Sequence, residues 1–301
     1  MILVVGATGV VGGMITQRLL EEEGREVRIL VRRDSPSSQL VQQGLATSAE
    51  ELIKAGAQPV YGDLRYRASL EAAVEGVETV ITTASSAMRG GTDNPQSVDL
   101  EGNRNLIEAA RDAGVKHFIF VSLLGADPNN PAPFVQAKAQ SESALRESGM
   151  EYTILAPTAF MEVWPAMVVG MPALQGQPVT LVGEGRRRHS FISNRDVAAF
   201  AVTAVDSLEA RNQHLAIGGP EPLTWRDVVA TYERVLGHSI PVEFVAPDEP
   251  IPGLPDPMPA LLAGMETYDS IVEMEETSRI FDVPLTRLET FVREQVGSHS
   301  A

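Results

Sequence analysis

The stretch that decides the fold is Met1-Ile2-Leu3-Val4-Val5, which runs directly into Gly6-Ala7-Thr8-Gly9-Val10-Val11-Gly12-Gly13. The first five residues form a continuous apolar run, which predicts a buried strand. The glycines then permit a tight turn at Gly6, a close backbone approach at Gly9 and close helix–strand packing at Gly12. Because a helix follows at once, its free N–H groups and partial positive charge face the loop. The stretch therefore predicts a pyrophosphate site, with a plain strand–helix turn as the alternative.

Short apolar runs alternate with helical patterns through the first half of the chain. Helical spacing of apolar residues covers 10–22 and 98–113, and a further helix over 132–148 ends before Gly149. Strand and helix repeating in this way predict an α/β fold with a doubly wound parallel sheet. The strand candidates are Met1–Val5, Glu26–Val31, Gln58–Tyr61, Thr79–Thr82, His117–Ser122 and Tyr152–Leu155.

The pattern changes after about residue 156, where helices and short strands mix. We therefore expect one domain over 1–156 and a smaller, interleaved α/β lobe over 157–301. Within that lobe, about 191–218 should return to the main sheet, because residues 214–218 have the pattern of one more strand. The stretch 241–259 holds seven of the 20 prolines and predicts a turn-rich connection rather than a core element.

Composition excludes several classes of protein. The chain has 301 residues, of which 44% are hydrophobic and 21% charged, and can bury a core without disulfides. It has no cysteine, which excludes a thiolate metal site and a cysteine nucleophile. Its net charge of −16 disfavours nucleic acid and anionic membranes as direct partners. With no visible targeting segment and scattered histidines, we expect a cytoplasmic monomer or homodimer without a metal site.

Two further stretches carry a family pattern, namely AGVKHFIFVS over 113–122 and EYTILAPTAFME over 151–162. With the Gly-x-x-Gly-x-x-Gly loop, they resemble the short-chain dehydrogenase/reductase superfamily and, within it, the atypical NmrA-like branch. That branch includes isoflavone reductase-like, triphenylmethane and quinone reductases and a redox-sensing regulator. The resemblance covers about 1–240. It implies a Rossmann domain that binds NAD(P) over 1–156 and a substrate lobe beyond it.

Arg32 and Arg33 end the second strand candidate, where an acid would hydrogen-bond the ribose hydroxyls of NAD. Guanidinium groups match a phosphate and stack on an adenine face, so NADP is favoured over NAD. Asp34 keeps NAD as the alternative, and two surface arginines closing a strand are the simpler interpretation. The loop and the resemblance together place the cofactor against Gly6, Thr8, Gly9, Val10, Val11, Gly12, Arg32, Arg33, Asp63, Leu64, Thr83, Ala84, Ser85, Lys138, Pro157 and Thr158.

The resemblance also places the catalytic residues, and here the chain departs from the usual pattern. Active relatives carry a strand-end Ser or Thr and a Tyr-x-x-x-Lys helix whose tyrosine transfers a proton. The matching residues are Ser122 and Phe134-Val135-Gln136-Ala137-Lys138, so the lysine is present and the tyrosine is phenylalanine. Phe134 and Lys138 should share a helix face that looks into the cleft. Lys138 or water would supply the proton and Ser122 would polarise a carbonyl oxygen. Purely structural roles are the alternatives for Ser122 and Lys138.

Phe160, Met161 and Trp164 predict an apolar wall of the substrate pocket beside Phe134, with core packing as an equal alternative. The expected function is an NADPH-dependent reductase that delivers hydride to an activated carbon of a small, mostly apolar molecule, such as a quinone or enone. The alternative is a non-catalytic, NAD(P)-binding redox sensor of the NmrA type. Phe134 is the reason for that alternative, since phenylalanine has no proton to give.

Overall fold

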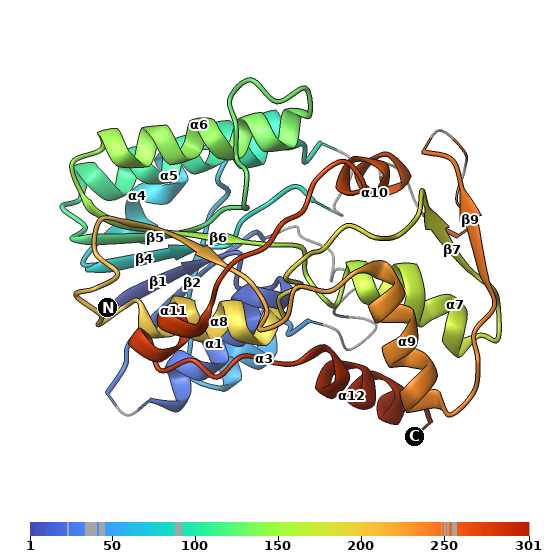
Figure 1. The fold of residues 1–301 in the computed structure, drawn as a ribbon. Helices are drawn as coiled ribbons and strands as arrows, with labels where there is room; N and C mark the ends of the chain where they lie inside the picture. Colours follow the sequence, from blue (N-terminus) through green and yellow to red (C-terminus); the bar gives the residue numbers. More distant parts are fainter. Residues whose placement is uncertain are drawn as a thin grey trace. The chain divides into compact units, whose positions relative to one another are not determined.

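A seven-stranded sheet organises the first part of the chain (Figure 1). The structure, a computed structural model, describes residues 1–22, 24–33, 41, 46–87, 92–247, 249, 251, 253–254 and 258–300. The strand order in the sheet is β3-β2-β1-β4-β5-β6-β8. The strands are β1 (Ile2–Val5), β2 (Val27–Val31), β3 (Gln58–Tyr61), β4 (Thr79–Thr82), β5 (His117–Val121), β6 (Glu151–Pro157) and β8 (Gln213–Ile217).

The strand pairs from β3 to β6 are all parallel. Strand β1 lies between β2 and β4, with Ile2 opposite both Val27 and Thr79. The chain therefore winds outward in one direction from β1 to β3 and in the other from β4 onward. In such sheets ligands bind at the carboxyl ends of the strands, where the winding reverses. This doubly wound parallel sheet is the fold that the sequence predicts.

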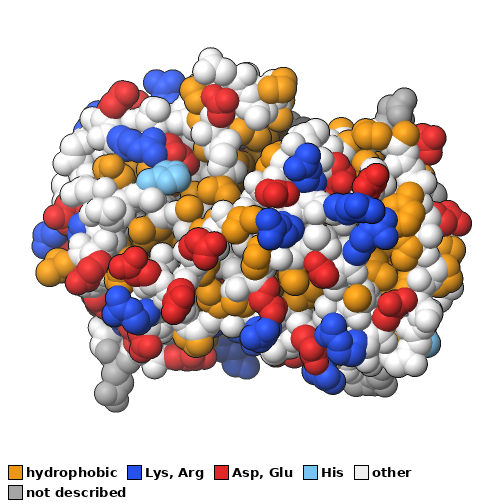
Figure 2. Space-filling model, viewed as in Figure 1, with side chains coloured by type: hydrophobic (Ala, Val, Ile, Leu, Met, Phe, Trp, Pro, Cys, Tyr) orange, Lys and Arg blue, Asp and Glu red, His pale blue; other side chains and the backbone are white. Residues whose placement is uncertain are grey.

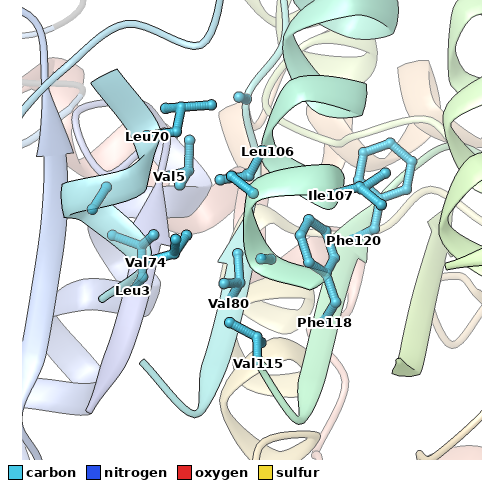
Figure 3. Close-up of a cluster of buried hydrophobic side chains, with 14 of the residues drawn as sticks. Leu3, Val5, Leu70, Val74, Val80, Leu106, Ile107, Val115, Phe118 and Phe120 are labelled. Atoms are coloured by element: carbon cyan, nitrogen blue, oxygen red, sulfur yellow. The ribbon is translucent and has the colours of Figure 1, made fainter. Parts of the chain in front are cut away.

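Helices cover both faces of the sheet. One face carries α4 (Ala68–Val74), α5 (Glu101–Asp112) and α6 (Pro133–Glu147), and the other carries α1 (Val10–Glu21), α3 (Ala49–Lys54) and α8 (Asn194–Thr203) (Figure 1). Figure 3 shows Phe118 and Phe120 projecting from β5 toward Leu106 and Ile107 of α5. All four side chains are buried in one core cluster. Burial of a side chain of this size stabilises the fold by roughly 1.5–3 kcal/mol.

The helix expected over 98–113 begins earlier and in a different form. A π-helical segment, η1 (Pro95–Leu100), precedes α5. Asn94 caps η1 through a capping box with Ser97, and Pro95 occupies the first turn, where no N–H partner is needed. Because η1 is wound more loosely than an α-helix, the side chain at Asp99 leaves the helix at a different angle from the one that α-helical spacing predicts.

The chain divides into two compact units, Met1–Ala156 with Val197–Ala216, and Pro157–Asp196 with Ile217–Ala301. The second unit has its own core, which includes Phe191, Trp225 and Tyr232. The stretch 241–259, expected to be a turn-rich connection, also contains a strand, β9 (Val242–Val245), which pairs in parallel with β7 (Val179–Val182), with Val242 opposite Val179. The side chains of β9 are half-buried or exposed, so it is an added strand but not a core element. The remaining elements are η2 (Pro165–Gly170), α7 (Met171–Leu174), β7 (Val179–Val182), α9 (Trp225–Leu236), β9 (Val242–Val245), α10 (Met258–Met265), α11 (Glu275–Ile280) and α12 (Leu288–Ser300).

Surface charge is mixed. Figure 2 shows acidic and basic side chains interspersed on the face in view, with no single large basic patch there. Among the described residues, no helix is both long enough and apolar enough to span a bilayer.

Candidate functional site

The glycine loop is closed by contacts that only glycine permits. Gly6 has a φ of +88°, and the Gly9 N–H donates to Gly6 O at 2.9 Å. A Cβ at Gly12 would lie 2.2 Å from Gly6 O, so helix α1 packs against the loop without room for a side chain. Such close packing of helix and strand is what the third glycine of a dinucleotide-binding loop provides.

The N-terminus of α1 is left open to a ligand. Its N-cap, Gly9, has no side chain to accept a hydrogen bond, and the first turn carries no acidic residue. The first-turn N–H groups include those of Val10, Val11 and Gly12, and Thr8 lies in the loop before them. Unpaired N–H groups at a helix N-terminus bind phosphate oxygens. These residues therefore fit the pyrophosphate of a dinucleotide.

The loop after β4 lies directly against the glycine loop. A Cβ at Gly6 would meet Thr83 Oγ1 at 2.6 Å and the backbone N of Ala84 at 3.0 Å. Ser85 follows and accepts a hydrogen bond from Ala87 N at 3.1 Å. The fold thus brings Thr83 and Ala84 beside Gly6, at the carboxyl edge where β1 and β4 are neighbours.

Arg32 and Arg33 follow β2 at the same edge, and each guanidinium contacts a neighbouring side chain. Arg32 Nη1 donates to both oxygens of Asp93, at 3.1 and 2.9 Å. The Arg33 guanidinium lies over the ring of Tyr61, 4.7 Å from its centroid. Sequence reasoning weighed Asp34 here, but that residue lies outside the described residues.

Asp63, after β3, is held by an arginine that sequence reasoning missed. Arg65 donates to the Asp63 carboxylate from its backbone N and from Nε and Nη2. Burial raises the pKa of Asp63, but the Arg65 hydrogen bonds outweigh it and leave the pKa below its usual value. Leu64, between them, is buried, and its carbonyl accepts from Asn105 Nδ2 at 2.9 Å. An i, i+2 acid–arginine pair in a loop was the only available sequence signal.

Lys138 is buried rather than solvated. Its side chain is 3% exposed, and its Nζ donates to Val121 O at 3.2 Å and lies 3.5 Å from Asp99 Oδ1. The other Asp99 oxygen accepts from Ser86 N and Oγ, at 2.9 and 2.5 Å. Burial lowers the pKa of Lys138, and the charge of Asp99 opposes that shift. A lysine held in this way transfers a proton more readily than a solvated one.

Phe134 lies one helical turn before Lys138 on α6. Lys138 Nζ is 5.7 Å from the centroid of its ring and 4.9 Å from that of Phe120. The ammonium is therefore flanked by two aromatic rings and an aspartate, all within the first unit. Neither ring carries an ionisable group, so Lys138 and Asp99 are the ionisable side chains of this cluster.

Ser122, directly after β5, points to a different partner. Its Oγ donates to Glu142 Oε1 at 2.5 Å, and both side chains are buried. Glu142 Oε2 also accepts from Arg146 at 2.9 Å and lies 3.4 Å from His214 Nε2. Burial raises the pKa of Glu142, but hydrogen bonds from His214 and Ser122 leave it lowered. A hydroxyl has one proton, so Ser122 must leave Glu142 before it can donate to a carbonyl oxygen.

The candidate residues of the second unit are held mainly by its own core. Met161 is 1% exposed, and Phe160 forms a β-bridge with Ile192. Trp164 packs against the same cluster of buried residues. Pro157 is the last residue of β6, and the Thr158 hydroxyl donates to Ser190 O. Core packing, the alternative stated for these aromatic and Met side chains, accounts for most of what the structure describes.

Glu162 has a structural role within the second unit. Its carboxylate accepts from Ser193 Oγ and from Asn194 N, both at 2.9 Å, and so caps the start of α8. Burial raises the pKa of Glu162, and the hydrogen bonds from Ser193 and Asn194 oppose that shift. Within the described part of the chain, no cluster of His, Asp and Glu is arranged to hold a metal ion.

Comparisons with known proteins agree with this geometry. A family model described as NAD(P)H-binding matches residues 6–208. An NAD(P)H azoreductase from Xenophilus azovorans is 32% identical over 246 residues, which cover 82% of this chain and 77% of that protein. The photosystem II assembly factor Ycf39 from Guillardia theta is 30% identical over 236 residues, covering 78% and 70%.

Among solved structures, an NADPH-dependent quinone oxidoreductase from Escherichia coli in complex with NADPH superimposes with a TM-score of 0.79. The two chains are 23% identical, and the match covers 98% of this chain and 99% of that one. At this level of identity the likeness concerns the fold. The family resemblance and the α/β fold expected from the sequence are confirmed by these matches.

Proposed function

This chain belongs to the NAD(P)H-binding family, and on that premise we propose that it is an NADPH-dependent reductase for an activated carbon of a small, mostly apolar molecule such as a quinone or enone. The observation that carries the proposal is Lys138, buried against Asp99 and next to Val121, the last residue of β5. A buried lysine paired with an aspartate is typical of a functional site, because packing of the core alone does not require two charged side chains at this edge of the sheet.

The cofactor supplies the hydride when it is bound. Gly6, Gly9 and Gly12 give its phosphates access to the N-terminus of α1, and Thr83 and Ala84 shape the floor beside them. Arg32 and Arg33 support NADPH over NADH, because guanidinium groups match a phosphate. The small residues of the loops leave space for the dinucleotide to lie along the strand ends.

Lys138 supplies or orients the proton that follows the hydride. Its lowered pKa brings the ammonium closer to the range in which a general acid works at neutral pH. Phe134 leaves no phenol for that step, so carbonyl reduction through tyrosine is not part of the proposal. Electron-poor carbons that accept a hydride without prior protonation are the substrates that this set of residues suits.

A second candidate function is an NAD(P)-binding protein that catalyses no reaction. The reason for considering it is Phe134, which offers no proton where active relatives have a tyrosine. The similarity to an assembly factor, Ycf39, also supports this second function. It differs from the reductase in one observable respect. A sensor binds the cofactor without consuming it, and its partner affinity changes between the oxidised and reduced forms.

The experiment that separates the two is a titration with NADPH and NADH by calorimetry, followed by a panel of quinones and enones at saturating cofactor. Lys138→Met keeps the aliphatic part of the side chain but removes the charge. Lys116→Met is the matched control, because the Lys116 side chain is 73% exposed. The reductase predicts oxidation of NADPH on some acceptor and a fall of about 100-fold in kcat for Lys138→Met only. Tight binding with no oxidation across the panel would favour the sensor.

A further inference from the structure

A third arginine stands beside the pair that follows β2. Arg65 lies after β3, and its guanidinium is fixed by Asp63, with Nη2 2.6 Å from Oδ2. Arg65 Nη1 also lies 3.7 Å from Asp93 Oδ1 and donates to Thr92 Oγ1 at 3.0 Å. Arg65 is therefore held on two sides, and neither side belongs to the glycine loop.

Strand pairing explains why Arg32 and Arg65 meet. In the parallel pair β2–β3, Val31 stands opposite Tyr61, so the residues after both strands emerge at the same edge of the sheet. The carboxylate of Asp93 lies between the two arginines, 2.9 Å from Arg32 Nη1. Its side chain is 9% exposed, whereas those of Arg32 and Arg65 are 30% and 27% exposed. The arginines are reachable from solvent, and the anion between them is largely covered.

The charges at this edge are unequal. The described side chains Arg32, Arg33 and Arg65 oppose the carboxylates of Asp63 and Asp93. Asp63 accepts hydrogen bonds on both oxygens from Arg65 and so orients that guanidinium. Asp93 is shared, and a carboxylate that two arginines share occupies the position in which a phosphate makes forked contacts.

We propose that Arg65 is a third specificity-determining arginine for the 2′-phosphate of NADPH, beside Arg32 and Arg33, and that Asp93 competes with this phosphate for Arg32 and Arg65. The inference rests on the proposed function only in taking NADPH as the ligand. Asp63 positions Arg65, and Asp93 keeps the two guanidinium groups together when no phosphate is bound. The 2′-phosphate must displace Asp93 from them, so selection for NADPH is weaker than three arginines alone would give.

The test is the binding of NADPH and NADH to the full chain, measured by calorimetry. Adenosine 2′,5′-bisphosphate and 5′-AMP are measured as two further ligands. Both lack the pyrophosphate, and only the bisphosphate carries the 2′-phosphate. The difference between them therefore isolates the contribution of the 2′-phosphate from that of phosphate in general. The variants are Arg65→Gln and Asp93→Asn. Arg67→Gln is the matched control, because Arg67 is a nearby arginine paired with Glu108 and Asp112 instead. Thermal unfolding without ligand shows that each variant is folded.

Arg65→Gln should weaken NADPH and the 2′,5′-bisphosphate by about 10- to 100-fold, the usual effect of losing charge-assisted hydrogen bonds to a phosphate. NADH and 5′-AMP should change less than about twofold. Asp93→Asn should tighten NADPH by about three- to tenfold, because it removes a competing charge.

Two results would overturn the inference. Equal loss of NADPH and NADH affinity in Arg65→Gln would make Arg65 a general binding residue. Weaker NADPH binding in Asp93→Asn would make Asp93 a support for the arginines rather than a competitor. If the unaltered chain binds neither dinucleotide, the proposed function itself fails, and that result is distinct from both.

Discussion

Lys138 Nζ lies 3.5 Å from Asp99 Oδ1, and the two side chains are 3% and 0% exposed. The pair joins α6 to the π-helical segment η1. A second contact joins the same two elements, because Ser141 Oγ of α6 donates to the backbone carbonyl of Asp99. Two opposite charges removed from water in this way depend on each other, since each would be strongly disfavoured alone. The placement of Lys138 is therefore a property of η1 as much as of its own helix.

Asp99→Asn should destabilise the fold by about 3 kcal/mol, because it leaves the Lys138 ammonium buried without its counter-charge. Urea unfolding followed by circular dichroism measures the change. Adding Lys138→Met should recover part of the loss, since the unpaired charge is then gone. Asp112→Asn, at an exposed ion pair with Arg67 and Arg111, is the control and should change stability by less than about 1 kcal/mol. Equal losses at the two aspartates would contradict the dependence of Lys138 on Asp99.

Phe134→Tyr should add a phenolic proton donor beside Lys138. The Phe134 ring centroid is 5.7 Å from Lys138 Nζ, so a phenol at this position would lie in the field of an ammonium, and a nearby positive charge lowers a phenol's pKa. Turnover of a ketone panel with NADPH should rise by about 10- to 100-fold, within the usual range for one general acid. Phe134→Leu is the control, because it changes the packing without adding a hydroxyl. A similar response of the two variants would show that packing, not proton donation, controls the step.

The sequence predicted the sheet well because each buried strand leaves a local signal. Thr79–Thr82 has the same bounds in the structure, since β-branched and apolar residues fill a strand buried between helices. Gln58–Tyr61 also has the predicted bounds, although it is a mostly exposed strand at the edge of the sheet. The same logic failed at Val242–Val245. Prolines surround this strand without lying inside it, so the composition of the segment concealed an edge pairing with β7.

Only the parts of the candidate site that lie in local sequence motifs were predictable. The glycine loop carries its own geometry, and Lys138 stands at a recognisable spacing from Phe134. The partners that decide the chemistry come from distant residues. Asp93 is 61 positions from Arg32, and Glu142 is 20 positions from Ser122. No local pattern relates such pairs, because they meet only when the helix that carries Glu142 and the loop that carries Asp93 pack beside the ends of the strands.

Gly12→Ala should abolish dinucleotide binding and destabilise the fold. The new methyl would lie 2.2 Å from Gly6 O, so the loop or the start of α1 must move. Overpacking at such a position costs about 1–3 kcal/mol. Calorimetry with NADPH and urea unfolding measure the two effects. Gly297→Ala in α12 is the control, because a methyl there meets nothing within 4 Å; it should raise stability by less than about 1 kcal/mol. Unchanged NADPH affinity in Gly12→Ala would remove the loop from the binding site.

Stability should fall with pH below 6.5 because of His117. This side chain is 1% exposed, and burial, with the nearby charge of Arg211, lowers its pKa from 6.5 to about 3. Thr153 Oγ1 donates to Ala210 O and so accepts from His117 Nε2, which leaves Nδ1 unprotonated. No described group pairs with Nδ1. Between pH 6.5 and 3 His117 is therefore protonated in the unfolded chain but stays neutral in the folded chain, so acid favours unfolding.

The expected loss from His117 is about 2.5 kcal/mol between pH 7 and pH 4.5, since one proton is worth about 1.4 kcal/mol for each pH unit below 6.5 and little above it. Urea unfolding at a series of pH values measures it. His117→Gln cannot take up the proton but keeps an N–H for Thr153, so its stability should fall less steeply with acid by that amount. His189, whose pKa burial lowers to about 4, still contributes in both proteins. Parallel pH profiles for the unaltered chain and His117→Gln would show that His117 is protonated in the folded chain.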